Sequence, residues 1–225
     1  MTLQEASRPG PLLRLYSFWR SSASYRVRIA LNLKGLRHEY VPVHLTEGGG
    51  QQFAPAFRAL NPQSRVPYLV DGDFGLGQSL AILDYLEALQ PEPALLPAEP
   101  RLRARVLAFC HAIVSDIQPL QNTGPLKYLG EQLGIDEPRR EAWIRHWIER
   151  GLGALEQERV AESAFVFGDA PTWADCVLVP QVYNAERFRC DVARFPRLYA
   201  VALRARELPA FAAAHPDRQP DAPRR

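Results

Sequence analysis

The sequence predicts a small α/β domain followed by an all-helical domain. Within the first ninety residues, runs of strand length and helix length follow one another in the order β-α-β, a connection, then β-β-α. Four prolines interrupt every periodic pattern between residues 91 and 100, which is typical of a linker. Beyond Arg101 the apolar residues recur only at helical spacing. We therefore expect domains at residues 11–92 and 99–221.

The first predicted domain begins with a strand that passes directly into a helix. Leu12–Ser17 is a short apolar run, and Ser21–Ser24 supplies hydroxyls suited to capping a helix N-terminus. Apolar residues then recur at helical spacing until Gly35, which is expected to end the helix. His38–His44 predicts a second strand parallel to the first. This strand should lie at a sheet edge, because Pro42 has no N–H to donate to a neighbouring strand.

A hairpin and a second helix complete this domain. Asp71-Gly72 lies between short apolar runs and predicts a tight turn between two strands. Gln78 and Ser79 follow and are expected to cap a helix over Leu80–Leu89. The stretch from about residue 51 to 60 has no clear pattern.

The second domain is expected to contain helices alone. Apolar residues recur at helical spacing over 106–117 and again over 143–152. Thr172–Asp175 has the spacing of a capping box, with Asp in the place usually taken by Glu, and should open a third helix. Two short helices are expected after it, at about 197–206 and 210–214, followed by a polar tail over 216–225.

Composition and charge exclude several classes of protein. The chain has 225 residues, of which 47% are hydrophobic and 23% charged, so it can bury a sizeable core and is not disordered. No apolar run approaches the roughly 20 residues that a membrane helix requires. The N-terminus has an early acid and no apolar core, so we expect no secretory signal, no membrane partner and a cytoplasmic location. The net charge is only +2 with scattered arginines, which argues against nucleic acid as a partner.

Cysteine and histidine spacing suggests neither a disulfide framework nor a metal site. The three cysteines are an odd number without C-x-x-C spacing, so they are expected to be reduced. The five histidines show no metal-ligand spacing, and no metal is expected. Glycine spacing fits neither a dinucleotide fingerprint nor a Walker A loop, so no nucleotide cofactor is implied.

Two pairs of polar residues fall at strand-to-helix junctions. Ser21 and Ser22 would place hydroxyls beside the unpaired N–H groups and the positive end of a helix, which is an anion or thiolate site, or else one of them is only an N-cap. Ser79 stands in a context similar to a nucleophile elbow, with an Asp and His215 downstream, which keeps an esterase as an alternative. Too few strands precede Ser79 for a hydrolase sheet, and its other interpretation is a helix cap.

Two arginines beside aromatic residues could grip carboxylates. Arg20 follows Trp19, and Arg187 precedes Phe188. A guanidinium holds a carboxylate through two parallel hydrogen bonds if it faces a cleft, and otherwise it is an ordinary solvated surface group.

Ser21–Leu31, which has the form S-S-x-x-x-R-V-R-I-A-L, resembles the signature of the zeta class of glutathione transferases, the maleylacetoacetate and maleylpyruvate isomerases. Further blocks are similar to that family in order and spacing: Asn61–Gln63, Val66–Pro67, Gln78–Ile82, Asp116–Asn122, Ala174–Gln181, Asn184–Phe188 and Gln219–Asp221. The resemblance runs from about Leu13 to Asp221.

This resemblance implies a thioredoxin-like N-terminal domain that binds glutathione, a helical domain that binds the substrate, and a homodimer. By matching position, Ser21 and Ser22 would be catalytic, and Arg20 and Arg187 would hold the carboxylates of a maleyl acid. The glutathione-binding residues would be Ser21, Ser22, Ala23, Gln52, Val66 ahead of a cis proline, Gln78, Ser79, Gln118, Asn122, Thr123 and Gly124. The chain departs from the family at Ala23, where many relatives have Cys, and at Gly124-Pro125, where many have a more helical run.

The activity that the resemblance implies is glutathione-dependent cis–trans isomerisation of maleylacetoacetate in tyrosine and phenylalanine degradation. Maleylpyruvate is the alternative substrate. A different class of activity is transfer of glutathione to small electrophiles such as α-halo acids, and a third alternative is a non-catalytic binding protein with the same fold. Consumption of glutathione would distinguish the transferase, and failure to bind immobilised glutathione would favour the last.

Overall fold

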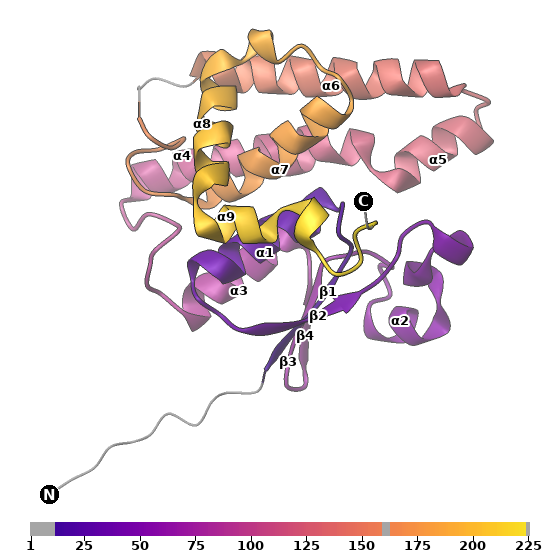
Figure 1. The fold of residues 1–225 in the computed structure, drawn as a ribbon, viewed down its shortest axis with the longest axis horizontal. Helices are drawn as coiled ribbons and strands as arrows, with labels where there is room; N and C mark the ends of the chain where they lie inside the picture. The colour runs from indigo at the N-terminus through magenta and orange to yellow at the C-terminus, as the bar shows by residue number, and fades with distance from the viewer. Residues whose placement is uncertain (1–11, 159–162, 224–225) are drawn as a thin grey trace, which may run out of the picture. The chain divides into compact units, whose positions relative to one another are not determined.

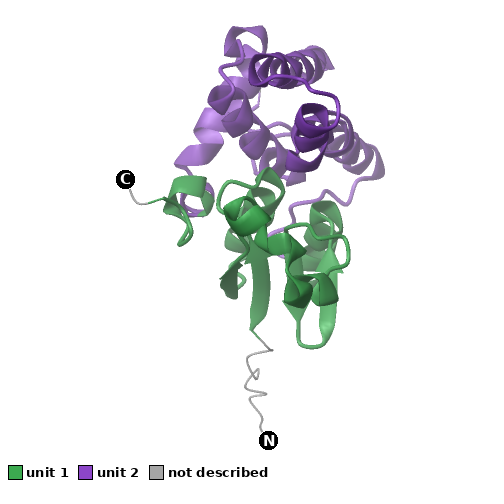
Figure 2. Ribbon diagram, turned by 90° about the vertical axis from the view of Figure 1, so that its right-hand side faces the viewer, with its two compact units in different colours: residues 1–90, 214–225 green, residues 91–213 purple. Residues whose placement is uncertain are grey.

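The computed structural model describes residues 12–158 and 163–223. They form two compact units, one comprising residues up to 90 together with the chain's end from 214, and the other comprising 91–213 (Figure 1; Figure 2). The boundary at 90 falls at the start of the proline-rich segment. The tail from residue 214 groups with the first unit, whereas the sequence placed the second domain's end at 221. Arg28 in the first unit, which is 1% exposed, donates through Nε to the Ala214 carbonyl oxygen at 3.1 Å, and this bond ties the tail there.

A four-stranded sheet forms the centre of the first unit. Its strands are β1 (Leu13–Ser17), β2 (His38–Pro42), β3 (Tyr68–Asp71) and β4 (Phe74–Gly77), in the order β2-β1-β3-β4. β1 and β2 are parallel, whereas β3 is antiparallel to both β1 and β4. The predicted strands, the edge position of β2 and the hairpin are all confirmed. Gly72 has φ +59° in the turn, which a residue without a Cβ adopts without strain.

Two helices of this unit pack against each other, α1 (Ser22–Leu33) and α3 (Ser79–Leu89). Leu15 and Leu69 from the sheet and Val27, Ile29 and Ile82 from these helices are at most 1% exposed. Each such side chain contributes roughly 1.5–3 kcal/mol through burial, so this core fixes both helix N-termini against the sheet. The stretch without a sequence pattern contains a short helix, α2 (Pro55–Leu60), preceded by 3-10 turns at Glu47–Gly49 and Gln51–Phe53.

The second unit is helical, as predicted. Its helices are α4 (Pro100–His111), α5 (Thr123–Glu131), α6 (Glu137–Glu158), α7 (Trp173–Arg187), α8 (Pro196–Glu207) and α9 (Pro209–Ala214), the last of which reaches the start of the tail. A π turn over Ala112–Ile117 and a 3-10 turn over Gln118–Gln121 continue α4, and Val192–Arg194 and Pro216–Arg218 form further 3-10 turns. α7 packs against α4, α6 and α8, and residues 173–182 are buried throughout. In the described ranges, no helix is long and apolar enough to cross a membrane.

The predicted capping box at the start of α7 is confirmed. The Thr172 side chain accepts the Ala174 N–H, and the Asp175 side chain accepts the Thr172 N–H at 2.8 Å. Asp175 also accepts the Val166 N–H at 2.9 Å, so the same carboxylate ties the preceding loop to the helix. The start of α7 is therefore fixed by hydrogen bonds within its own first turn and by a hydrogen bond to the preceding loop.

Candidate active site

Ser21 lies where β1 passes into α1. It is the N-cap residue, with an extended backbone (φ −66°, ψ 118°), and its Oγ accepts the Ser24 N–H at 3.2 Å. Because a hydroxyl donates one hydrogen as well as accepting, this bond leaves the Ser21 hydrogen free to point outward. Ser22 begins the helix and is 6% exposed. The two interpretations of Ser21, N-cap and thiolate donor, are compatible in this geometry.

Ser22 and Ala23 stand in the first turn of α1. N–H groups at these positions lie at the positive end of the helix dipole. Ala23 carries no polar side-chain atom, so backbone and hydroxyl groups make up the chemistry of this turn. Such a turn stabilises a negative charge placed beside it.

The pairing of the strands brings four predicted site segments to one end of the sheet. Tyr68 is opposite Tyr16 on β1 and opposite Gly77 on β4. The segments that follow β1 toward Ser21, precede β3 at Val66 and follow β4 at Gln78 therefore leave the sheet at the same end. The parallel strand β2 ends there too, because Ser17 is opposite Pro42, and the chain continues from it to Gln52. The topology thus brings residues far apart in sequence to the same end of the sheet.

Val66 and Gln52 contribute different features to this end of the sheet. The Val66–Pro67 peptide bond is cis, directly before β3, and Val66 is 8% exposed. The Gln52 side chain is buried and donates from Nε2 to the Leu45 carbonyl oxygen at 3.3 Å. Its Oε1 is buried and has no partner among the residues that the structure describes. A buried acceptor of this kind costs free energy until a donor reaches it, so Gln52 suits a ligand with an N–H group.

Gln78 occupies a strained position at the N-terminus of α3. It is the N-cap residue, but its side chain makes no capping hydrogen bond and instead donates to Gln63 Oε1 at 2.7 Å. Gln78 therefore occupies the predicted N-cap position, but its side chain does not make the hydrogen bond that would cap the helix. Gln78 also has φ +64°, a conformation that costs a non-glycine residue about 1–3 kcal/mol and that clusters at functional sites.

Ser79 and Arg26 place a positive charge at the same helix N-terminus. Ser79 Oγ accepts from Arg26 Nη1 at 3.1 Å, and the Arg26 side chain is fully buried. The guanidinium adds its charge to that of the helix dipole, so a carboxylate is the ligand that this corner favours. A guanidinium cannot accept the Ser79 proton, and the described ring contact of His215 is with Tyr25. These contacts give no support to the esterase alternative.

The predicted site residues of the helical unit lie around the start of α5 and the end of α7. Gln118 is 8% exposed and donates to Asn122 Oδ1 at 3.2 Å, while Asn122 is the N-cap of α5. Thr123 and Gly124 form its first turn, and a Cβ at Gly124 would meet no atom within 4 Å. Arg187 ends α7, with its guanidinium 4.3 Å from the centre of the Phe188 ring.

Buried amide side chains connect the start of α5 with the end of α7, and no sequence pattern predicted a role for them. Gln121 donates to Gln181 Oε1 at 2.9 Å and accepts from Asn184 Nδ2 at 3.2 Å. Asn184 in turn accepts from Arg187 Nη1 at 3.3 Å. Gln181 Nε2 has no partner among the described residues, but the other bonds of the network restrain side-chain orientation and hold the Arg187 guanidinium in place relative to the Gln118 segment. Arg20, in the first unit, lies over the Trp19 ring at 5.5 Å.

Comparisons with known proteins identify the family. Residues 15–94 match the family model of the glutathione S-transferase N-terminal domain, and residues 137–213 match that of the C-terminal domain. The chain is 48% identical to the maleylacetoacetate isomerase of Pseudomonas aeruginosa over 212 residues, which are 94% of this chain and 99% of that protein. A solved structure described as a holo maleylpyruvate isomerase, a bacterial zeta-class enzyme, is 45% identical, with a TM-score of 0.90 over 93% of this chain and 100% of that one. This chain belongs to the zeta class of the glutathione S-transferase family.

A second solved structure bears directly on the ligand. It is the maleylacetoacetate isomerase of Anaeromyxobacter dehalogenans with glutathione bound in its active site, and its sequence is 47% identical to this chain. The TM-score is 0.84, and the match covers 95% of this chain and 100% of that one. The predicted family and fold class, a thioredoxin-like domain followed by a helical glutathione S-transferase domain, are thus confirmed.

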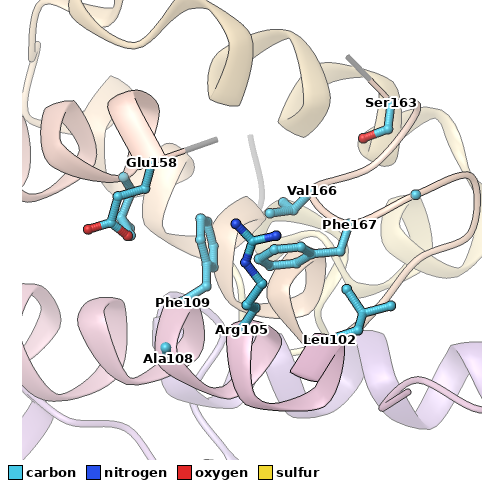
Figure 3. A pocket seen from close by; sticks show the side chains of 10 residues that line it. Leu102, Arg105, Ala108, Phe109, Glu158, Ser163, Val166 and Phe167 are labelled. Atoms are coloured by element: carbon cyan, nitrogen blue, oxygen red, sulfur yellow. The ribbon is translucent and has the colours of Figure 1, made fainter. Parts of the chain in front are cut away.

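The helical unit of this glutathione S-transferase also contains a cavity of about 550 Å³ (Figure 3). Figure 3 shows Arg105 beside Phe167, and the rings of Phe109 and Phe167 meet edge to face at 5.9 Å. The lining comes from α4, the end of α6 and residues 163–168, and it includes none of the site residues predicted from sequence. In the described part of the chain, no group of His, Cys, Asp or Glu side chains could hold a metal ion.

Proposed function

We propose that this glutathione S-transferase is a glutathione-dependent cis–trans isomerase that converts maleylacetoacetate to fumarylacetoacetate in tyrosine and phenylalanine degradation. The observation that carries the proposal is the Ser21 hydroxyl at the N-terminus of α1, on a chain 48% identical to a maleylacetoacetate isomerase. Conversion of a cis double bond requires a nucleophile that adds and leaves again. It requires no pair of acid and base carboxylates, in keeping with the hydroxyls, amides and arginines of this site.

The site residues fit glutathione at two independent places. The corner formed by Gln78, Ser79 and the buried Arg26 suits the γ-glutamyl carboxylate, and the buried Gln52 Oε1 suits an N–H group of the tripeptide. Val66, directly before β3, would pair with the backbone of the tripeptide. The remaining contacts in this proposal come from Gln118, Asn122, Thr123 and Gly124 in the helical unit.

When bound, glutathione supplies a thiolate that adds to the cis double bond of the substrate and leaves once the carbon chain has rotated. A free thiol has a pKa of ~8.5 and is mostly protonated at neutral pH. In this proposal the Ser21 hydroxyl donates to the sulfur, and Ser22 and Ala23 add the N–H groups of the first helical turn. Both effects favour the thiolate and lower the pKa of the bound thiol.

Arg20 and Arg187 complete the proposed site as carboxylate clamps. Maleylacetoacetate carries a carboxylate at each end, and two guanidinium groups orient such a molecule more firmly than one. The amide network that ends at Asn184 restrains Arg187 and so lowers the entropy lost on binding.

The proposal is tested by following maleylacetoacetate isomerisation spectroscopically while measuring total glutathione. We expect turnover that requires glutathione and leaves its concentration unchanged. Maleylpyruvate assayed in parallel decides between the two substrates by kcat/KM. Consumption of glutathione by α-halo acids without isomerisation would instead identify a transferase, and failure to bind immobilised glutathione would favour a non-catalytic protein.

Two substitutions at Gln78 should separate backbone strain from ligand binding. Gln78→Gly relieves the positive φ, so we expect the free energy of unfolding to rise by about 1 kcal/mol while glutathione affinity falls about tenfold. Gln78→Ala keeps the strain and should lose affinity to the same extent without gaining stability. Urea denaturation and calorimetric titration with glutathione measure the two quantities. Unchanged affinity in both variants would remove Gln78 from the proposed site.

We further infer that the protein acts in the cytoplasm as a homodimer. Membership of the glutathione S-transferase family supports this inference. Sedimentation equilibrium should give twice the 25.4 kDa mass of the chain. A single-chain mass at micromolar concentration would contradict the dimer.

A further inference from the structure

The C-terminal tail returns to the loop that carries Ser21. Figure 2 shows it in the colour of the first unit. Asp221 Oδ2 accepts the Trp19 N–H at 2.9 Å, across 202 positions of sequence, and Asp221 Oδ1 accepts from the Tyr40 hydroxyl at 2.6 Å. One carboxylate therefore joins the β1–α1 loop to strand β2. The sequence predicts only a polar tail in this region, and the family resemblance implies no role for Asp221.

The backbone N–H and the carbonyl oxygen of Trp19 are both hydrogen-bonded to residues outside the β1–α1 loop. Asp221 binds its N–H, and Arg28 Nη2 donates to its carbonyl oxygen at 3.0 Å. Arg28 also donates to the Phe18 carbonyl oxygen at 3.4 Å and to the Ala214 carbonyl oxygen at 3.1 Å. The same buried guanidinium thus anchors the loop and the start of the tail. These bonds fix the backbone from the end of β1 to the residue before Arg20.

Ser21 depends on this stretch of backbone for its position. Its N–H donates to the Phe18 carbonyl oxygen at 3.0 Å, which closes a turn around Trp19 and Arg20. Loss of one restraint within that turn allows Ser21 to shift, and a displacement near 1 Å at a catalytic group can cost on the order of 100-fold in rate. Asp221 supplies the restraint that lies farthest from Ser21 in sequence.

We propose that Asp221 is a positioning residue that holds the Trp19 peptide so that the Ser21 hydroxyl points at the glutathione sulfur. The inference deepens the proposed function and rests on it, because it assigns to Ser21 the role of thiolate donor. Tyr40 is the second hydrogen-bond partner of Asp221. Burial and the Asp221 hydrogen bond both raise the pKa of Tyr40, so this tyrosine is neutral and remains a donor.

Asp221→Ala is the principal test. It leaves the Trp19 N–H without its acceptor, so we expect kcat to fall about tenfold while KM for the maleyl acid changes less than twofold. The pKa of the enzyme-bound glutathione thiol should rise, seen as an about tenfold smaller thiolate absorbance at neutral pH. A purely structural role would lower stability without moving the bound thiol pKa, and that result would overturn the proposal.

Three matched variants sharpen the test. Asp221→Asn keeps an acceptor for Trp19, and the Tyr40 hydroxyl can turn to accept from the new amide, so most of the activity should return. Tyr40→Phe removes the bond to Asp221 and the Tyr40 hydrogen bond with Ser17, leaves the Trp19 bond in place, and should keep kcat and the thiol pKa within about twofold. Asp217→Ala removes an exposed carboxylate of the same tail and should have no effect. Equal losses in Asp217→Ala and Asp221→Ala would contradict a specific role.

A measurement on the intact protein covers the case in which Asp221→Ala does not fold. The Trp19 amide should exchange slowly with solvent, because its N–H is bonded to Asp221. Fast exchange, as in an exposed loop, would overturn the proposal. If the wild type isomerises no maleyl acid, the proposed function fails, but the thiol pKa of bound glutathione still tests Asp221.

Discussion

Ser21→Ala should reduce kcat for maleylacetoacetate isomerisation about 100-fold, the usual cost of removing one donor that stabilises a developing or resting anion. The hydroxyl is the side-chain donor that the structure places at the α1 N-terminus with a hydrogen to spare, since its Oγ already accepts the Ser24 N–H. The pKa of the bound glutathione thiol should rise toward that of the free tripeptide. Steady-state kinetics and a pH titration of thiolate absorbance measure both effects.

The helix cap complicates that substitution and calls for a second variant. Ser21→Ala also removes an N-cap, which costs about 1 kcal/mol of stability. Ser21→Asp keeps an acceptor for the Ser24 N–H and suits the helix dipole, but at neutral pH it has no hydrogen to donate. We expect it to be as stable as the wild type and as inactive as Ser21→Ala. An active Ser21→Asp variant would show that the backbone N–H groups or Ser22 hold the sulfur instead.

The fold of the first unit was predictable because its signals are local. A turn such as Asp71-Gly72 is set by adjacent residues, and the edge position of β2 follows from one proline. Helix α2 carried no such signal, since its six residues are too few to show a period. Most of the second unit was predictable for the same reason, including the capping box at Thr172, but helix α5 was not predicted.

The candidate site was predictable only in part from local pattern. Ser21 could be placed at a helix N-terminus from the residues alone, but its assignment and those of Gln52 and Gln78 depended on the family resemblance. Neither the local sequence pattern nor the family resemblance identified the side chains that support these residues. Arg26 reaches Ser79 across 53 positions, Arg28 reaches Ala214 across 186, and Asp221 reaches Trp19 across 202. A buried arginine or a tail aspartate looks like an ordinary solvated residue until the chain has folded.

The largest loss of stability is expected from Asp175→Ala. The Asp175 carboxylate is fully buried and accepts hydrogen bonds from the Val166 N–H, the Thr172 N–H and the Thr172 hydroxyl at 2.8–3.0 Å. Removing it leaves these donors buried without an acceptor and opens the first turn of the central helix, so the free energy of unfolding should fall by about 3 kcal/mol. Urea denaturation at neutral pH measures this change.

A second aspartate provides the control, and pH provides an independent readout. Asp191 also caps a short helix, but it is exposed, so Asp191→Ala should cost less than about 1 kcal/mol. Burial raises the pKa of Asp175 to about 6, although its hydrogen bonds oppose that change. The folded state therefore binds this proton more tightly than the unfolded state, and the free energy of unfolding should decrease as pH rises from about 4 to about 6. Asp175→Ala should lose that part of the pH dependence, and a variant that retains it would show that another group titrates.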